Sequence, residues 1–295
     1  MNYYNEIKQE LINNEIYKKV KDYSKNRSDL NTYYKVGKIL SEAGKHYGEG
    51  ILKQYSNKLT KELGKGYTLT NLKYMRQFYL FCEKSHAVRD QLTWTHYREL
   101  IFMDDVCEIE YYIRIVIEQN LSYRELHKRI KNKEYERLSI KTKQKLIKKE
   151  ENKIEDFIKN PILIKNSYNY TDISEKLLKQ LILEDLDNFL NELGEGVTYI
   201  KNEYKIKVGM NYNYIDLLLY NIKYNCYVVV ELKVTELKKE HIGQIRLYMN
   251  YIDKKIKTIY QDKTIGIIIC KKDNEFVMEY CSDERIFRTI YKINS

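Results

Sequence analysis

Residues 214–233, YIDLLLYNIKYNCYVVVELK, decide the fold of the C-terminal half of this chain. Two strongly apolar runs, residues 214–220 and 226–232, flank the more polar stretch 221–225. Continuous apolar runs of this length, rich in Val, Leu and Tyr, are typical of strands that are buried on both faces of a sheet. The sequence therefore predicts two neighbouring strands joined by a short turn.

Both predicted strands carry an acidic residue, Asp216 in the first and Glu231 in the second. An ionised carboxylate is costly to bury without a partner, so these residues lie near strand ends or meet a cation. A turn centred between Lys223 and Tyr224 places Asp216 directly opposite Glu231, with Cβ atoms about 5 Å apart. Two carboxylates that close repel each other unless they share a divalent cation. A one-residue bulge would break this register.

Lys233 follows Glu231 by two residues, so both side chains project from the same face of the strand. Mg²⁺ held by Asp216, Glu231 and the backbone carbonyl of Leu232 would activate a water and polarise a phosphate oxygen. Lys233 would orient that water or neutralise the developing negative charge. The competing interpretation is an ion pair between Lys233 and either acid at the rim of the sheet, because the pattern D-x14-E-x-K is loose by itself. The position of both acids on apolar strands favours a functional site.

The rest of the C-terminal half alternates between helix and strand patterns. Residues 174–193 have helical periodicity and end at glycine, and residues 238–255 return to that periodicity. Residues 199–208 alternate as a strand does, and residues 264–270 form another buried apolar run. The order of helix, three strands, helix and strand predicts a mixed sheet with flanking helices.

The first 140 residues are predicted to form a helical domain. Residues 51–63 repeat apolar side chains every four positions, and residues 72–79 resume the helical period after a Gly64-Lys65-Gly66 turn. Ser122, followed three residues later by Glu125, has the capping-box pattern of a helix start.

The residues around position 150 are dominated by Lys and Glu, and the only proline of the chain, Pro161, follows them. Such composition is typical of a solvated helix or a semi-rigid connector. We therefore expect a helical domain over residues 1–140, a charged linker over 141–164 and an α/β domain over 165–295.

Composition narrows the class of protein. The net charge of +10 suits a polyanionic partner such as DNA, although a codon bias towards Lys would give the same excess. The longest apolar runs are too short to span a bilayer, and residues 1–10 are charged where a signal peptide is apolar, so we expect a cytoplasmic protein without a membrane partner. The five cysteines are scattered as reduced thiols would be. P-loop, dinucleotide-binding and G-x-S-x-G patterns are absent from the sequence.

Taken together, several stretches of the chain resemble the PD-(D/E)XK nuclease superfamily, and more closely its YhcG-like branch. The stretches that carry the resemblance are 215–220 (IDLLLY), 230–233 (VELK), 243–248 (GQIRLY), 189–194 (FLNELG), 47–50 (YGEG), 71–79 (NLKYMRQFY) and 92–96 (LTWTH). The resemblance covers nearly the whole chain. It implies an α+β two-domain protein, with an all-α, winged-helix-like N-terminal domain and a C-terminal α/β domain of the restriction-endonuclease-like fold.

The resemblance implies that Asp216, Glu231 and Lys233 are the motif residues. It adds Gln244 and Tyr248, whose four-residue spacing places them on one face of the following helix, near the metal site or the DNA backbone. Simple helix packing is the alternative role for Tyr248.

The resemblance also implies a further metal ligand, an acid on the first helix of the nuclease domain. Glu184 is the candidate, and three other acids compete with it: Glu175, Asp185 and Asp187. The proline of the "PD" motif is absent, since Ile215 precedes Asp216.

The helical domain offers residue types that contact phosphates and base edges on the predicted helix over residues 71–79. These candidates are Asn71, Lys73, Arg76 and Gln77. A solvated helix face that binds nothing would have the same composition.

The sequence thus predicts a Mg²⁺-dependent DNA nuclease, with Mn²⁺ as a substitute ion, acting in restriction, phage defence or recombination. The alternatives are a non-catalytic nucleic-acid-binding or scaffold protein that retains the fold, and a nuclease acting on RNA. One metal site per chain would require two chains, or two successive cuts, to break a duplex, so the sequence is compatible with a homodimer. It is also compatible with a separate protein partner.

Overall fold

The computed structural model describes residues 3–20, 25–85, 92–148, 150–281 and 283–294. The chain divides into two compact units, Met1–Tyr135 and Glu136–Ser295. Within the described residues, no helix combines the length and apolarity that a membrane span requires.

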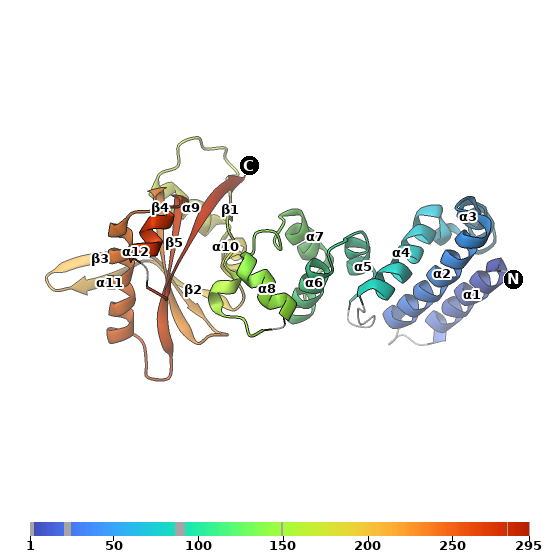
Figure 1. The fold of residues 1–295 in the computed structure, drawn as a ribbon, viewed down its shortest axis with the longest axis horizontal. Helices are drawn as coiled ribbons and strands as arrows, with labels where there is room; N and C mark the ends of the chain where they lie inside the picture. Colours follow the sequence, from blue (N-terminus) through green and yellow to red (C-terminus); the bar gives the residue numbers. More distant parts are fainter. Residues whose placement is uncertain (1–2, 21–24, 86–91, 149, 282, 295) are drawn as a thin grey trace. The chain divides into compact units, whose positions relative to one another are not determined.

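The first unit consists of helices wherever the structure describes it (Figure 1). They are α1 (Tyr3–Val20), α2 (Lys25–Tyr47), α3 (Gly50–Leu63), η2 (Lys65–Tyr67), α4 (Leu69–Ser85), α5 (Trp94–Leu100), α6 (Val106–Gln119) and α7 (Tyr123–Lys131). Apolar side chains from α1 to α4, such as Leu40, Leu59 and Leu72, meet in one core. Gly37 allows α2 to approach α4 closely, because a Cβ there would lie 2.1 Å from the carbonyl oxygen of Met75.

The helical prediction for this unit is confirmed, including two of its local signals. Gly64 ends α3 with a φ of 104°, in the left-handed region that glycine adopts readily. Ser122 and Glu125 form the expected capping box at the start of α7. The winged-helix detail is not confirmed, since the described residues of this unit include no strand that would form a wing.

The second unit is a six-stranded mixed sheet with helices on both faces, as predicted (Figure 1). Its elements are α8 (Ile140–Lys148), η3 (Ile154–Phe157), β1 (Ile162–Lys165), α9 (Glu175–Glu184), α10 (Leu186–Leu193), β2 (Val197–Val208), β3 (Asn211–Asn221), β4 (Cys226–Glu236), α11 (Lys239–Lys255), β5 (Asp262–Lys272), α12 (Glu275–Cys281) and β6 (Ile286–Asn294). The strand order is β1-β6-β5-β4-β3-β2. Neighbours from β2 to β4 are antiparallel, and those from β4 to β1 are parallel.

Each face of the sheet has its own core. Leu178 of α9 and Phe189 of α10 pack against one face, together with alternate residues of the central strands. Ile245 and Met249 of α11 pack against the other face. Gly266 of β5 brings α11 close to the sheet, because a Cβ there would lie 2.7 Å from Met249 Sδ and 2.8 Å from Ile245 Cδ1.

The segment expected as a linker, residues 141–164, differs from that expectation, because it folds as part of the second unit. It contains α8, η3 and the edge strand β1, which pairs in parallel with β6. Thr142 on α8 is fully buried and donates a hydrogen bond to the carbonyl oxygen of Asp156 at 3.0 Å. Glu150, Glu151 and Lys153 of this segment are exposed, whereas Lys159 is buried and donates to the carbonyl oxygen of Asn191 at 2.8 Å.

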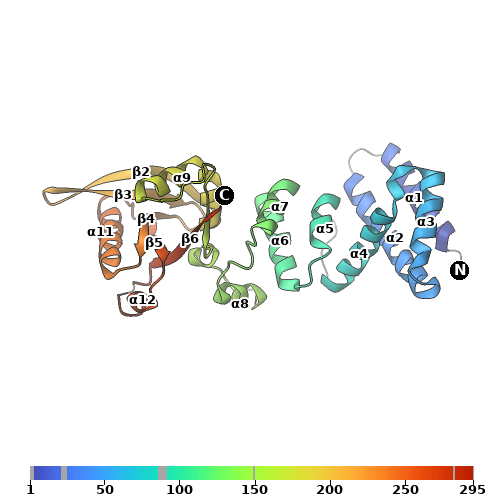
Figure 2. The same ribbon diagram turned by 90° about the horizontal axis from the view of Figure 1, so that it is seen from above.

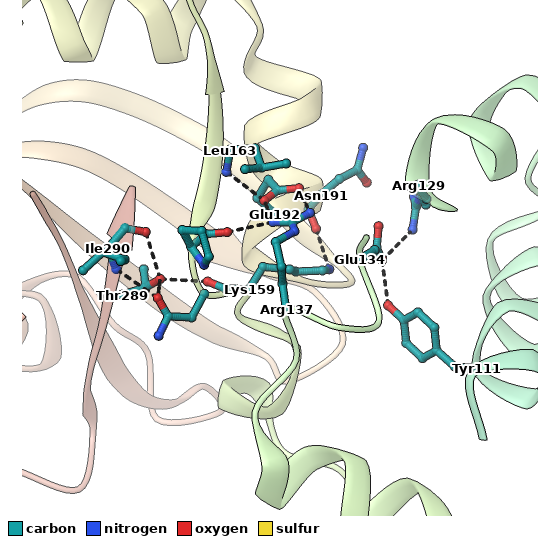
Figure 3. Close-up of polar contacts among 12 residues, drawn as sticks. Tyr111, Arg129, Glu134, Arg137, Lys159, Leu163, Asn191, Glu192, Thr289 and Ile290 are labelled. Atoms are coloured by element: carbon teal, nitrogen blue, oxygen red, sulfur yellow. Dashed lines mark hydrogen bonds and ion pairs between the residues drawn. The ribbon is translucent and has the colours of Figure 1, made fainter. Parts of the chain in front are cut away.

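A buried ion pair fixes the start of this segment (Figure 3). Arg137 donates from both terminal nitrogens to the carboxylate of Glu192 on α10, with 2.9 Å between Nη2 and Oε1, and both residues are buried. Arg137 Nη1 also donates to the carbonyl oxygen of Pro161 at 2.8 Å, and the Leu163 amide donates to Glu192 Oε2 at 3.0 Å. These contacts join the beginning of the unit, β1 and α10.

Four cysteines, Cys82, Cys107, Cys226 and Cys270, are reduced and form no disulfide in the described part of the chain, as the sequence predicts. The side chain of Cys281 lies outside the described residues.

Candidate active site

The candidate site lies where β3 and β4 separate. The ladder between these strands runs from Asn221 opposite Cys226 to Leu217 opposite Val230, which is the predicted register. Beyond that pair, β3 continues only with β2 and β4 only with β5. The fork between the strands therefore opens at the next two residues, Asp216 and Glu231.

Asp216 takes over the hydrogen bonding at the end of the ladder. Its Oδ2 accepts from the backbone amide of Leu232 at 3.0 Å. The Asp216 and Glu231 side chains also hydrogen-bond to each other. The expected juxtaposition of the two acids is thus present, although they belong to a fork and not to a continuous ladder.

The two carboxylates share one strongly perturbed environment. Burial, reinforced by the charge of Asp216, raises the pKa of Glu231 to about 9. Burial also acts to raise the pKa of Asp216, but hydrogen bonds from Glu231, Lys179 and the Leu232 amide outweigh it and lower that pKa. In the absence of a bound cation, these opposite shifts favour one proton shared by the pair. Glu231 Oε2 is buried and has no hydrogen-bond partner among the described residues.

Lys179 on α9 is a member of this site that sequence reasoning missed. Its Nζ lies 2.8 Å from Asp216 Oδ1 and 3.2 Å from Glu203 Oε1. Burial acts to lower the pKa of Lys179, but its bonds to Asp216 and Glu203 outweigh burial and raise that pKa. α9 begins at its Ser174 cap, which accepts a hydrogen bond from the Leu177 amide, and so delivers Lys179 from its second turn. A lysine within an amphipathic helix gives no signal of its own in the sequence.

The alternation of side chains between the two sides of the sheet is interrupted in β3 at Asp216. Ile215 and Leu218 pack on the α11 side of the sheet, whereas Leu217 and Leu219 pack on the α9 side. Residues 215 and 217 would share a side in a regular strand. On the neighbouring strand, Glu203 has a φ of 47°, a left-handed conformation that is uncommon for a non-glycine residue. Asp216 lies at this local irregularity, with its carboxylate against Lys179.

Lys233 also reaches α9. Its Nζ lies 4.0 Å from Glu175 Oε1, and 12% of its side chain is exposed. The charge of Lys233 acts to lower the pKa of Glu231, while Glu175 acts to raise it. Lys233 and Glu175 thus lie within the electrostatic reach of the carboxylate pair.

The acid that α9 places at the site is Glu175, in place of the expected Glu184. Glu175 and Lys179 are four residues apart and share one helix face, whereas Glu184 lies nine residues from Glu175 and therefore on the opposite face. Glu184 is exposed and accepts a hydrogen bond from Gln180 at 2.9 Å. The helix is shorter than predicted, so Asp185 and Asp187 lie beyond its end.

Gln244 and Tyr248 lie together on α11, as their spacing predicts. Gln244 Nε2 donates to Tyr248 Oη at 2.9 Å. Burial raises the pKa of Tyr248, and the charges of Glu231 and Asp216 raise it further. Tyr248 is 3% exposed and packs in the core beneath α11, so it combines a packing role with proximity to the acids.

The donor set fits a hard divalent cation that keeps several waters. The described residues hold no cluster of three or more His, Cys, Asp or Glu side chains arranged to hold a metal ion. Two carboxylates with a backbone carbonyl, here that of Leu232, are the kind of partial oxygen shell that Mg²⁺ accepts. A bound cation would give the buried Oε2 of Glu231 a partner. It would also displace the proton that the raised pKa of Glu231 favours.

The four candidate DNA-contact residues of the helical unit divide into two kinds. Arg76 is held by Glu49, whose carboxylate oxygens lie 2.7 and 2.6 Å from its Nη1. Asn71 donates to the carbonyl oxygen of Gly66 at 2.8 Å. Lys73 and Gln77 are exposed and lie four residues apart on one face of α4.

Comparisons with known proteins agree with this architecture. Residues 155–293 match the YhcG PDDEXK nuclease domain, and residues 7–137 match the DUF1016 N-terminal domain. YhcG of Escherichia coli (strain K12) is 22% identical over 288 residues, covering 81% of this chain and 76% of that protein.

Solved structures give shorter matches. A repair endonuclease from Pyrococcus abyssi is 21% identical with a TM-score of 0.30, covering 41% of this chain and 48% of its own. EndoMS in a complex with dsDNA is 17% identical with a TM-score of 0.29, covering 44% of this chain and 48% of its own. Matches of this length and score do not identify an activity. The two domain models together account for nearly all of the sequence, and the chain belongs to the YhcG-like family of the PD-(D/E)XK nuclease superfamily.

Proposed function

We propose that this chain is a divalent-metal-dependent DNA nuclease, with Asp216 and Glu231 as metal ligands and Lys233 beside them. One observation carries the proposal. Two carboxylates are held together at a fork in the sheet, and one oxygen of Glu231 is buried without a hydrogen-bond partner among the described residues. Such an arrangement is electrostatically unfavourable unless a proton or a cation joins the pair.

Each residue has a distinct task in hydrolysis. A bound Mg²⁺ or Mn²⁺ would lower the pKa of a coordinated water and polarise a phosphate oxygen. Asp216 is pre-oriented at both carboxylate oxygens, because Oδ2 accepts from the Leu232 amide and Oδ1 lies 2.8 Å from Lys179 Nζ. Lys233 is mostly buried next to the acids and would stabilise negative charge on the phosphate or hold the water. Gln244 and Tyr248 would orient these groups from α11.

The choice of DNA as substrate rests on charge and on the helical unit. The net charge of +10 favours a polyanion, and α4 presents Lys73 and Gln77 to solvent. We extend the proposal to a DNA- or partner-binding role for the helical unit and to a cytoplasmic location. We also propose a homodimer, because two chains with one site each would cut the two strands of a duplex.

The test is cleavage of supercoiled, linear, single-stranded and branched DNA, and of RNA, in Mg²⁺, in Mn²⁺ and in EDTA. Asp216→Asn and Lys233→Met should each lower the cleavage rate by about 100-fold or more, as the loss of a group acting on the transition state does. Lys176→Met is the control for Lys233→Met, because it makes the same substitution at an exposed lysine of α9. Binding without cleavage under all of these conditions would favour the scaffold alternative, and cleavage of RNA alone would correct the substrate.

A further inference from the structure

The outer part of the β2–β3 hairpin, residues 204–215, forms an arm that extends beyond the rest of the sheet. β3 leaves its ladder with β4 after Leu217, so these residues pair only with each other. Both views show the end of the hairpin reaching past α11 (Figures 1 and 2). We call residues 204–215 the hairpin arm.

The hairpin arm has one buried and one exposed face. Ile206 and Ile215 pack into the core beside α11. On the opposite face, the register pairs Lys205 with Tyr214 and Lys207 with Tyr212. Tyr214 is 52% exposed and Tyr212 is 55% exposed, so a row of lysines and tyrosines faces solvent.

The exposed row is positively charged. The hairpin arm contains two lysines and no acidic residue. Lys205 Nζ lies 3.9 Å from the centre of the Tyr212 ring, and within the described part of the chain neither lysine has an ion-pair partner. Lysines on an edge strand such as β2 also discourage pairing with another sheet, but that role does not require exposed tyrosines beside them.

The row leads directly to the candidate site. Tyr212, Tyr214 and Asp216 follow one another at two-residue steps along β3. At roughly 3.3 Å per residue, Tyr214 lies about 7 Å and Tyr212 about 13 Å along the strand from Asp216. These distances correspond to about two and four nucleotides of a stacked strand, which rises roughly 3.4 Å per nucleotide.

We propose that the hairpin arm binds the DNA strand about two to four nucleotides from the phosphate that is cut. Lys205 and Lys207 contact phosphates, and Tyr212 and Tyr214 stack on sugars and bases. This inference rests on the proposed nuclease function, because it takes Asp216 as the point where the strand is cut.

The test measures binding of the full chain to fluorescently labelled single-stranded and duplex DNA in EDTA over a range of salt concentrations. The double variant Lys205→Ala/Lys207→Ala should weaken binding roughly tenfold near 0.1 M salt and lower the slope of log K against log salt by about 1.4 to 1.8, the value for two phosphate contacts. Tyr212→Ala/Tyr214→Ala should weaken single-strand binding about tenfold or more through lost stacking. Lys205→Arg/Lys207→Arg should retain wild-type binding.

The control is Lys254→Ala/Lys255→Ala, which removes two exposed lysines from the end of α11. If the arm variants bind and cut as this control does while the wild type binds and cuts DNA, the inference about the arm is overturned and the nuclease function stands. If the wild type neither binds nor cuts any DNA, both are overturned. A thermal melt of each variant checks that the fold is intact.

Discussion

Lys179 Nζ lies 2.8 Å from Asp216 Oδ1, so a protein cation already occupies one side of the carboxylate that we assign to the metal. The same amine lies 3.2 Å from Glu203 Oε1. Lys179 therefore has an alternative acceptor when a divalent cation approaches Asp216. Its charge stabilises the acid pair without metal and weakens the attraction of the site for a second cation.

Replacing Lys179 with methionine should uncouple these two effects. Without metal, the variant loses a mostly buried ion pair and should be about 1–3 kcal/mol less stable. With Mg²⁺ or Mn²⁺ it should recover more stability than the wild type does, because the cation replaces the lost charge. Thermal melts in EDTA and in increasing Mn²⁺ check this, with Lys176→Met as the control. An equal metal-induced shift in variant and wild type would contradict the role given to Lys179.

Glu231→Gln should separate folding from metal binding. In the absence of metal, Glu231 shares a proton with Asp216, and a glutamine can keep that hydrogen bond at nearly the same volume. We therefore expect the stability of the variant in EDTA to stay within about 1 kcal/mol of wild type. Its stabilisation by Mn²⁺ should be lost, since an amide is a weaker ligand than a carboxylate. A retained Mn²⁺ shift would remove Glu231 from the ligand set.

The sequence predicts the central strands of the second unit correctly but does not reveal its edge strand, β1. The apolar runs and their turn fix the β3–β4 register, because a slip by one residue would move the apolar side chains to the other side of the sheet. β1 has only four residues and follows a charged segment, so no period distinguishes it. Its identity depends on a partner more than 100 residues away, β6, which sequence periodicity does not reveal.

The candidate site shows the same division. Asp216, Glu231 and Lys233 stand out because they interrupt or follow apolar strands. Lys179 and Glu175 sit among many charged residues of an amphipathic helix, and only the packing of α9 on the sheet selects which of them face the fork. The helix predicted over residues 174–193 ends at Glu184, and the sequence does not indicate which face of the shorter helix turns towards the fork.

The buried ion pair between Arg137 and Glu192 should control the stability of the second unit. Arg137→Met leaves the Glu192 carboxylate buried without its charge partner, and should cost about 3–5 kcal/mol in the free energy of unfolding. Lys165→Met, at an exposed position of β1, should have little effect. Urea unfolding followed by circular dichroism measures both. A cost near that of the control would show that residues 136–163 are held mainly by other contacts.

In the helical unit, substitutions on α4 should affect different properties. Lys73→Ala/Gln77→Ala removes exposed groups and should weaken DNA binding without changing the melting temperature. Arg76→Met and Glu49→Gln both remove the ion pair between Arg76 and Glu49. The two variants should therefore change the melting temperature by the same amount. If DNA binding falls with Arg76→Met but not with Glu49→Gln, Arg76 contacts the DNA directly and its bond to Glu49 is only its resting state.

The two acids of α9 provide the sharpest comparison, because they differ in helix face and share a helix. Glu175→Gln should lower Mg²⁺-dependent cleavage by about tenfold or more, as the loss of a group that orients the catalytic residues does, since its carboxylate lies 4.0 Å from Lys233 Nζ. Glu184→Gln should leave cleavage unchanged, because Glu184 is exposed and bonded to Gln180. Titrating Mg²⁺ for each variant shows whether the loss at Glu175 lies in metal affinity or in the rate at saturation. A larger loss at Glu184 would mean that α9 rotates when DNA binds. In the complex with DNA, Glu184 and not Glu175 would then face the fork.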